Sequence, residues 1–165
     1  MAYELGHFIS GKRVAGGSGR SGDVFNPTTG DVQGKVSFAT KAEVTHAIDA
    51  AEKAFPAWAA TNPQRRARVM FKFKELVEKD TPNLARLLSS EHGKILPDAR
   101  GDIQRGLEVI EFACGIPHLQ KGEYTDAAGA GIDVYSMRQP LGVVAGITPF
   151  NFPAMIPMWM FGVAI

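Results

Sequence analysis

The chain has 165 residues, of which 45% are hydrophobic and 21% are charged, as in an ordinary globular domain or a piece of a larger one. Eighteen basic and 17 acidic residues give a net charge of +1, so the charge balance indicates no nucleic-acid partner. A single cysteine, Cys114, excludes an internal disulfide framework, and the N-terminus lacks the basic and apolar regions of a secretory signal. We therefore expect a cytoplasmic protein, and we expect no metal site.

The first part of the chain reads as short strands and turns. Residues 8–14 predict a hairpin with its turn at residues 10–12, and residues 24–27 and 32–39 predict a second strand pair. The Gly/Ser-rich run of residues 16–22 lacks the lysine spacing of a phosphate-binding loop. We expect it to be a flexible connection.

Helices follow from residue 40. Thr40 and Glu43 have the spacing of a capping box. Apolar residues then recur at three- and four-residue intervals, which predicts one buried helix face. These residues are Val44, Ala47, Ile48, Ala51, Phe55 and Trp58.

Asn62 and Pro63 mark the start of the next helix. Its apolar residues are expected to face inward, and its five basic residues are expected to form a solvated face rather than a nucleic-acid site. The apolar set comprises Val69, Met70, Phe73, Leu76 and Val77. Thr81 and Pro82 predict the start of a third helix, which Gly93 would end.

Pro97 begins a fourth predicted helix, in which Ile103, Leu107, Ile110 and Cys114 form one apolar stripe. Arg105 lies in line with Val109 and Phe112 on a second stripe that we also expect to be buried. An arginine in such a place needs an anionic partner. Spacing favours a salt bridge to Asp102 or Glu108, whereas guanidinium geometry also suits a ligand carboxylate.

The last part of the chain predicts a strand, a loop and a helix. Residues 132–138 alternate like an exposed antiparallel strand, and residues 141–147 read as a parallel strand covered on both faces. Residues 154–165 would form the crossover helix. The loop between them would then lie at the carboxyl end of a parallel strand, where open α/β sheets bind ligands.

Residues 139–165 carry no charge and are long enough to cross a bilayer. Pro149 and Pro153 interrupt the centre of this run and would leave backbone groups unpaired in lipid. A buried strand followed by a buried helix explains the same hydropathy and also accommodates the prolines. We therefore expect no membrane association.

Asn151 stands between Pro149 and Pro153, which restrict the backbone on both sides. Its amide could donate to an oxyanion formed by attack on a carbonyl group. It could equally stabilise the loop through an Asx-turn or cap the following helix. Local chemistry leaves both roles open.

Several motifs together resemble the aldehyde dehydrogenase superfamily, in its methylmalonate-semialdehyde dehydrogenase branch. The main one is Gly-Val-Val-Ala-Gly-Ile-Thr-Pro-Phe-Asn-Phe-Pro at residues 142–153, followed by Met-Ile-Pro-Met-Trp-Met-Phe. Further matches are Phe-Ile-Ser-Gly-Lys, Phe-Asn-Pro-Thr-Thr-Gly, Ala-Phe-Pro-Ala-Trp, Arg-Arg-Ala-Arg-Val-Met-Phe, Glu-His-Gly-Lys and residues 105–115. The pair Gly162–Val163 departs from the Pro-Met pair usual in this branch.

The resemblance implies an enzyme that oxidises malonate or methylmalonate semialdehyde with NAD and passes the acyl group to coenzyme A with loss of carbon dioxide. It implies a place in valine and pyrimidine catabolism, and in some bacteria inositol catabolism. Asn151 falls on the oxyanion-stabilising asparagine, Arg105 on an arginine that holds the substrate carboxylate, and Thr148 and Phe150 on a loop that lies against NAD. Cys114 does not match the nucleophile and is expected to be a helix core residue.

A full family member is much longer, and its nucleophilic cysteine would lie beyond residue 165. We therefore expect an N-terminal part without turnover of its own; the alternatives are a noncatalytic binding or regulatory remnant and another NAD(P)-dependent aldehyde dehydrogenase. The implied fold is α/β, a helix-rich part of a Rossmann-type coenzyme domain. It would divide into residues 1–123 with hairpins and helices, 124–140 with an antiparallel oligomerisation strand, and 141–165 with the first parallel strand, the catalytic loop and the crossover helix. Full-length members are dimers or tetramers, so we expect a homo-oligomer.

Overall fold

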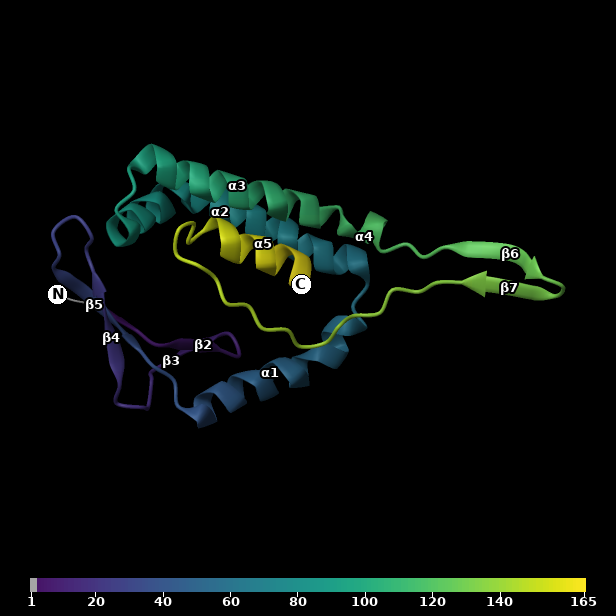
Figure 1. Ribbon diagram of the computed structural model, residues 1–165, viewed down its shortest axis with the longest axis horizontal. Helices are drawn as coiled ribbons and strands as arrows, with labels where there is room; N and C mark the ends of the chain where they lie inside the picture. Colours follow the sequence, from purple (N-terminus) through teal and green to yellow (C-terminus); the bar gives the residue numbers. More distant parts are fainter. Residues whose placement is uncertain (1–2) are drawn as a thin grey trace.

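The computed structural model describes residues 3–165 and combines two small sheets at the N-terminus with a helical body and a projecting hairpin (Figure 1). In chain order the elements are β1 (Tyr3–Leu5), β2 (His7–Ile9), β3 (Lys12–Val14), β4 (Ser21–Phe25), β5 (Val32–Ser37), α1 (Lys41–Ala59), α2 (Pro63–His92), α3 (Leu96–Cys114), α4 (Ile116–Leu119), β6 (Tyr124–Gly129), β7 (Ile132–Tyr135) and α5 (Met155–Ala164).

Both predicted N-terminal strand pairs are confirmed. β2 pairs antiparallel with β3, and β4 pairs antiparallel with β5. β1 adds a strand parallel to β5 that the sequence did not indicate, because three residues carry too little pattern. The hydroxyl of Tyr3 in β1 donates to Glu91 Oε1 at 2.7 Å and so ties this sheet to α2. Burial and this carboxylate together raise the pKa of Tyr3 to about 12.

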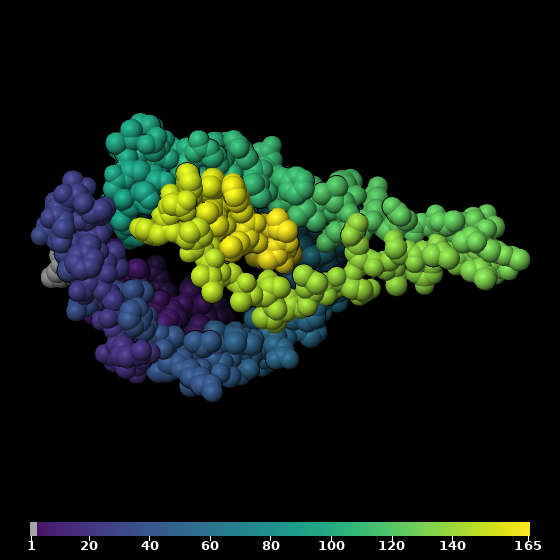
Figure 2. All heavy atoms as spheres, in the orientation of Figure 1, coloured from purple at the N-terminus to yellow at the C-terminus, as the bar shows by residue number. Residues whose placement is uncertain are grey.

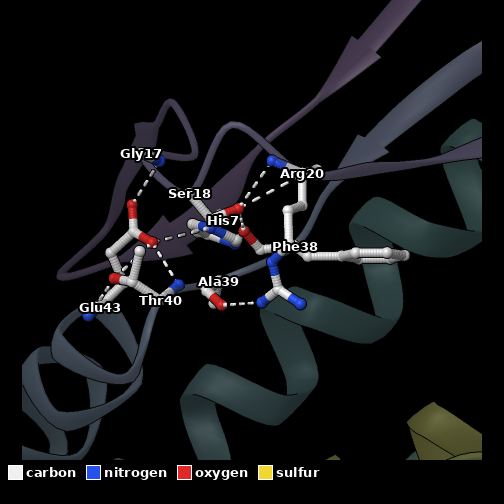
Figure 3. Close-up of polar contacts among 8 residues, drawn as sticks. All are labelled: His7, Gly17, Ser18, Arg20, Phe38, Ala39, Thr40 and Glu43. Carbon is white, nitrogen blue, oxygen red and sulfur yellow. Dashed lines mark hydrogen bonds and ion pairs between the residues drawn. The ribbon is translucent and has the colours of Figure 1, made fainter.

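The predicted capping box at the start of α1 is formed. Glu43 N donates to Thr40 Oγ1 at 3.1 Å, and Thr40 N donates to Glu43 Oε2 at 2.7 Å. Gly17 N donates to the second carboxylate oxygen of Glu43, so the Gly/Ser-rich loop is held against the helix start (Figure 3). The N–H groups of Thr40 and Gly17 lower the pKa of Glu43.

The expected burial of the apolar face of α1 is wrong for this structure. No residue of α1 is buried, and Val44 and Ile48 are 49% and 51% exposed. The reason is that, within residues 3–165, no element packs along this helix closely enough to cover the face. Val69 and Leu76 of α2, also expected inward, are exposed to a similar degree.

One long helix, α2, replaces the two that were expected. Pro82 lies inside it, and Gly93 ends it with a φ of +85°, the left-handed conformation that favours glycine. Pro82 is exposed, so water can solvate the carbonyl group that its missing N–H leaves free. The Thr81 hydroxyl donates to the Val77 carbonyl at 2.9 Å, within the same helix, and so does not cap a new one.

The hydrophobic core lies where α3 packs between α2 and α5 (Figure 1). The predicted stripe of α3 is confirmed, since Ile103, Leu107, Ile110 and Cys114 are all buried. Gly106 permits the close approach of α5, because a Cβ atom there would lie 3.2 Å from the Met155 Cα and would meet the Met158 side chain. A helix is thus formed where residues 154–165 predicted one, and it remains regular through Gly162; its predicted role as a crossover between parallel strands stays a prediction.

Strands β6 and β7 form an antiparallel hairpin that extends away from the helical body as an arm (Figure 2). The strand predicted from residue 132 is confirmed as β7, with every residue exposed. The exposed surface of the arm includes large apolar and aromatic side chains. These are Tyr124 at 63%, Ile132 at 58%, Val134 at 53% and Tyr135 at 66% exposure.

The parallel strand predicted at residues 141–147 is not formed. The segment has no regular secondary structure and is exposed, with Leu141 and Ile147 at 94% and 93%. A strand needs a neighbour for its backbone hydrogen bonds, and no strand of residues 3–165 lies beside this segment. In the same described region, no helix is both long and apolar enough to cross a membrane.

Candidate active-site loop

The loop between residue 147 and α5 presents the Asn151 side chain to solvent. Asn151 is exposed, and within residues 3–165 its amide group makes no hydrogen bond. Ala154, not Asn151, occupies the N-cap of α5, and no side chain caps that helix. The alternative roles of capping residue and loop staple are therefore not supported. An amide that is free of internal partners remains available as a donor to a ligand.

The backbone around Asn151 is held by a buried ion pair. Asp102, on α3, is fully buried, and its Oδ2 accepts from Lys94 Nζ at 2.9 Å. Its Oδ1 accepts from the backbone N–H of Met155 at 2.7 Å. Lys94 Nζ also donates to the carbonyl oxygen of Asn151 at 3.1 Å and lies 4.5 Å from the centre of the Phe152 ring. One ion pair thus contacts the chain at Asn151, Phe152 and Met155.

Thr148 and Phe150 lie on the exposed side of the same loop. Phe150 is 57% exposed, and its ring centre lies 5.7 Å from that of His92 at the end of α2. Within residues 3–165, no backbone N–H group of residues 141–151 makes a hydrogen bond. The backbone donors of this segment are therefore unpaired, as expected for a segment that has no neighbouring strand in the described region.

Arg105 occupies a different setting from the one expected. Its side chain is exposed, and so is Phe112 at 57%, so the predicted second buried face of α3 is wrong. The alternative salt bridge is also wrong, because Asp102 pairs with Lys94 and no ion pair of residues 3–165 includes Arg105. The Arg105 carbonyl accepts from Trp159 Nε1 at 3.3 Å, which ties this turn of α3 to α5. The guanidinium remains without an anionic partner in the described chain.

Cys114 lies at the end of α3 and is 7% exposed. Burial raises the pKa of its thiol, which disfavours the nucleophilic thiolate. The prediction that Cys114 is a core residue is confirmed.

The sequence did not predict the pairing of Lys94 with Asp102, which was considered only as a partner of Arg105. One signal was available for Asp102, which lies four and eight residues before Gly106 and Ile110 and so falls on the buried side of α3. A carboxylate on a buried face requires a partner. The partner, Lys94, lies in the loop after the C-cap of α2. Helical periodicity does not predict the direction of a side chain outside a helix.

The family model described as the aldehyde dehydrogenase family matches residues 14–165. A malonate-semialdehyde dehydrogenase of Pseudomonas aeruginosa is 52% identical over 161 residues, which are 98% of this chain and 32% of that protein. A mitochondrial acylating methylmalonate-semialdehyde dehydrogenase of Arabidopsis thaliana is 51% identical over 165 residues, which are 100% of this chain and 27% of that protein.

A crystal structure of a protein from Sinorhizobium meliloti that has been assigned as a methylmalonate-semialdehyde dehydrogenase, complexed with NAD, matches with a TM-score of 0.96 and 64% identity. The match covers 98% of this chain and 33% of that one. The chain therefore spans about a third of the length of the relatives it matches. The likeness confirms the predicted α/β fold of an aldehyde dehydrogenase N-terminal portion.

Proposed function

This chain belongs to the aldehyde dehydrogenase family, and on that premise we propose that it supplies the oxyanion donor and part of the NAD site of a CoA-acylating (methyl)malonate-semialdehyde dehydrogenase. The observation that carries the proposal is the Asn151 amide, which is exposed and free of internal hydrogen bonds between two prolines. Similarity to malonate- and methylmalonate-semialdehyde dehydrogenases supports the substrate class.

In this proposal Asn151 Nδ2 donates to the aldehyde oxygen as that oxygen gains negative charge. A donor held in place before the reaction stabilises the transition state without reorganisation. The exposed loop that carries Thr148 and Phe150 would lie against NAD, and the relative solved with NAD supports a nicotinamide cofactor. The negative charge would arise when a cysteine thiolate that these residues do not supply adds to the aldehyde carbon, and NAD, when bound, would accept the hydride from that adduct. The coenzyme A thiol would then displace the enzyme thiol and take the acyl group, and the substrate carboxylate would leave as carbon dioxide.

Arg105 is proposed to bind the carboxylate of the semialdehyde. Its exposed guanidinium has no anionic partner within residues 3–165, and such a group suits a planar carboxylate. Replacing Arg105 by leucine should raise KM for a semialdehyde carboxylate by about tenfold or more, while an uncharged aldehyde such as propanal is turned over as before. An equal effect on both aldehydes would remove this role.

The residues of this chain alone should not turn over an aldehyde, because Cys114 is buried and its thiol pKa is raised. A chimaera provides the test: residues 1–165 replace the matching third of the Sinorhizobium meliloti relative, which is 64% identical. Reduction of NAD by malonate semialdehyde and coenzyme A is followed by absorbance. We expect activity in the chimaera and none in the separate 165 residues.

Replacing Asn151 by alanine in the chimaera should lower kcat by about a hundredfold or more, since one oxyanion donor is lost. Thr45→Ala, at an exposed position of α1, serves as the control and should leave kcat unchanged. A folded chimaera without activity, or an Asn151→Ala variant with normal kcat, would contradict the proposed function.

The projecting hairpin β6–β7 is proposed to join copies of the full-length enzyme, because its exposed strands carry aromatic and aliphatic side chains without a partner in the described chain. Replacing Val134 by lysine should shift the chimaera to a smaller species in light scattering. An unchanged mass would argue against this interface.

A further inference from the structure

The side chains of Asp102 and Lys94 restrain the loop that carries Asn151 and leads into α5. Asp102 is fully buried, and both of its carboxylate oxygens accept hydrogen bonds, from Lys94 Nζ and from the Met155 N–H. Removing either partner would leave a buried charge unsatisfied, which is strongly unfavourable. The distances between α3, the segment after α2 and the start of α5 are therefore tightly determined.

Lys94 extends this restraint to Asn151 itself. Its side chain is 12% exposed, and its ammonium group donates to the Asn151 carbonyl as well as to Asp102. The Lys94 backbone is held in turn, because Ser89 Oγ donates to the Lys94 carbonyl at 2.7 Å. A cation thus binds the backbone of the residue whose side chain is directed to solvent.

The rest of the loop offers no comparable support. Residues 141–151 donate no backbone hydrogen bond within residues 3–165, and Ile147 and Phe150 are largely exposed. Apart from Pro149 and Pro153, the described hydrogen bonds to Asn151 and Met155 come from the Lys94–Asp102 pair. The neighbouring residues add the ring contact of Phe150 with His92 and the hydrogen bond from Ile156 N to the Phe152 carbonyl at 3.3 Å. An oxyanion donor loses most of its effect when it is misplaced by about 1 Å.

We propose that Lys94 and Asp102 are positioning residues for the Asn151 amide, acting through the Asn151 carbonyl and the Met155 N–H. This inference rests on the proposed oxyanion role of Asn151. Lys94 and Asp102 touch neither the aldehyde nor the cofactor in this scheme. Their contribution is to hold the amide where negative charge develops, so it should appear in kcat rather than in KM.

The test is a double-mutant cycle in the chimaera, with kcat normalised to folded protein. Lys94→Met should lower kcat by about tenfold to a hundredfold with little change in KM. Lys94→Gln, which keeps an N–H donor, should recover part of the loss. Lys72→Met removes a lysine whose ion pair with Glu75 is exposed, and it should have no effect.

The decisive comparison is with Asn151→Ala. If Lys94 acts through Asn151, adding Lys94→Met to the Asn151→Ala variant should lower kcat hardly any further, because the amide that Lys94 positions is already absent. The inference would be overturned if the fold-losses in kcat of the two single variants multiplied in the double variant. Independent losses of this kind are expected when Lys94→Met damages the structure in general rather than the placement of the amide. An Asn151→Ala variant with an unchanged kcat would instead overturn the proposed function, so the two failures are distinguishable.

Hydrogen exchange supplies a readout that does not depend on activity. In Lys94→Met and Asp102→Asn chimaeras, the Met155 amide should exchange at least about tenfold faster than in the parent, because its acceptor is no longer held. Amides in the centre of α3 report any general loss of stability, so the exchange rate of the Met155 amide should rise relative to theirs. Unchanged exchange at Met155 in both variants would contradict the positioning role.

Discussion

Helices α1 and α3 have the same length, 19 residues, and both show apolar residues at helical spacing, yet they have opposite surroundings. α3 lies between α2 and α5 and buries eight residues, whereas α1 buries none. The difference teaches that periodicity determines where a helix forms and which face is apolar. Whether that face is covered depends on a second element that packs against it. Of these two helices, only α3 has such a neighbour along its length within residues 3–165.

The largest expected effect contrasts one isoleucine from each helix. Ile103 on α3 is fully buried, and Ile48 on α1 is 51% exposed. Ile103→Ala should lower the free energy of unfolding of the 165-residue chain by about 2–5 kcal/mol, because it removes buried methyl groups and leaves a cavity. Ile48→Ala should cost no more than about 1 kcal/mol. Denaturant unfolding measures both, and equal losses would break the comparison.

A second prediction contrasts two glycines of α3. Gly106→Ala would place a Cβ against Met155 and Met158 and should cost about 1–3 kcal/mol of unfolding free energy. At Gly101 the nearest atom to a new Cβ is a guanidinium nitrogen of the exposed Arg105 side chain at 3.5 Å, an ordinary van der Waals distance. Gly101→Ala should therefore stabilise the helix, by up to about 1 kcal/mol. The pair is measured by thermal unfolding, and stabilisation by both would show that α5 does not pack closely on Gly106.

The smallest expected effect concerns the start of α1, whose stability depends on local hydrogen bonds rather than burial. The pKa of Glu43 is lowered in the folded chain, chiefly by the Thr40 and Gly17 N–H groups. Its contribution to stability is therefore fully present above the unfolded pKa and is lost as the pH falls through the lowered folded pKa. Unfolding measured from neutral to acidic pH should show this loss for the native chain.

The matched variants sharpen this pH prediction. Glu43→Gln cannot ionise, so its stability deficit should shrink as the pH falls. Glu52→Gln, on an exposed position of the same helix, should not change the pH profile. A Glu43→Gln deficit that is constant across the acidic range would argue against the capping carboxylate as its source.

Much of the secondary structure was predictable, because its signals are local. The capping box of Thr40 and Glu43, the glycine stop at Gly93 and the apolar stripe of α3 all appear as expected. The break expected at Pro82 was wrong, because an exposed proline inside a long helix can be tolerated. The strand expected at residues 141–147 was wrong for a different reason: its hydrogen bonds require a neighbouring strand.

In the candidate site, too, some features depend on local sequence and others on tertiary packing. The sequence by itself determined the rigid Pro-Phe-Asn-Phe-Pro turn, the resemblance that singles out Asn151, and the helix that follows, since these depend on residue type and spacing. Only the tertiary structure decided that Asp102 pairs with Lys94 rather than Arg105, and that this pair holds the Asn151 carbonyl and the Met155 N–H. A buried carboxylate takes the partners that three-dimensional packing brings within hydrogen-bond distance, and sequence spacing does not specify those partners.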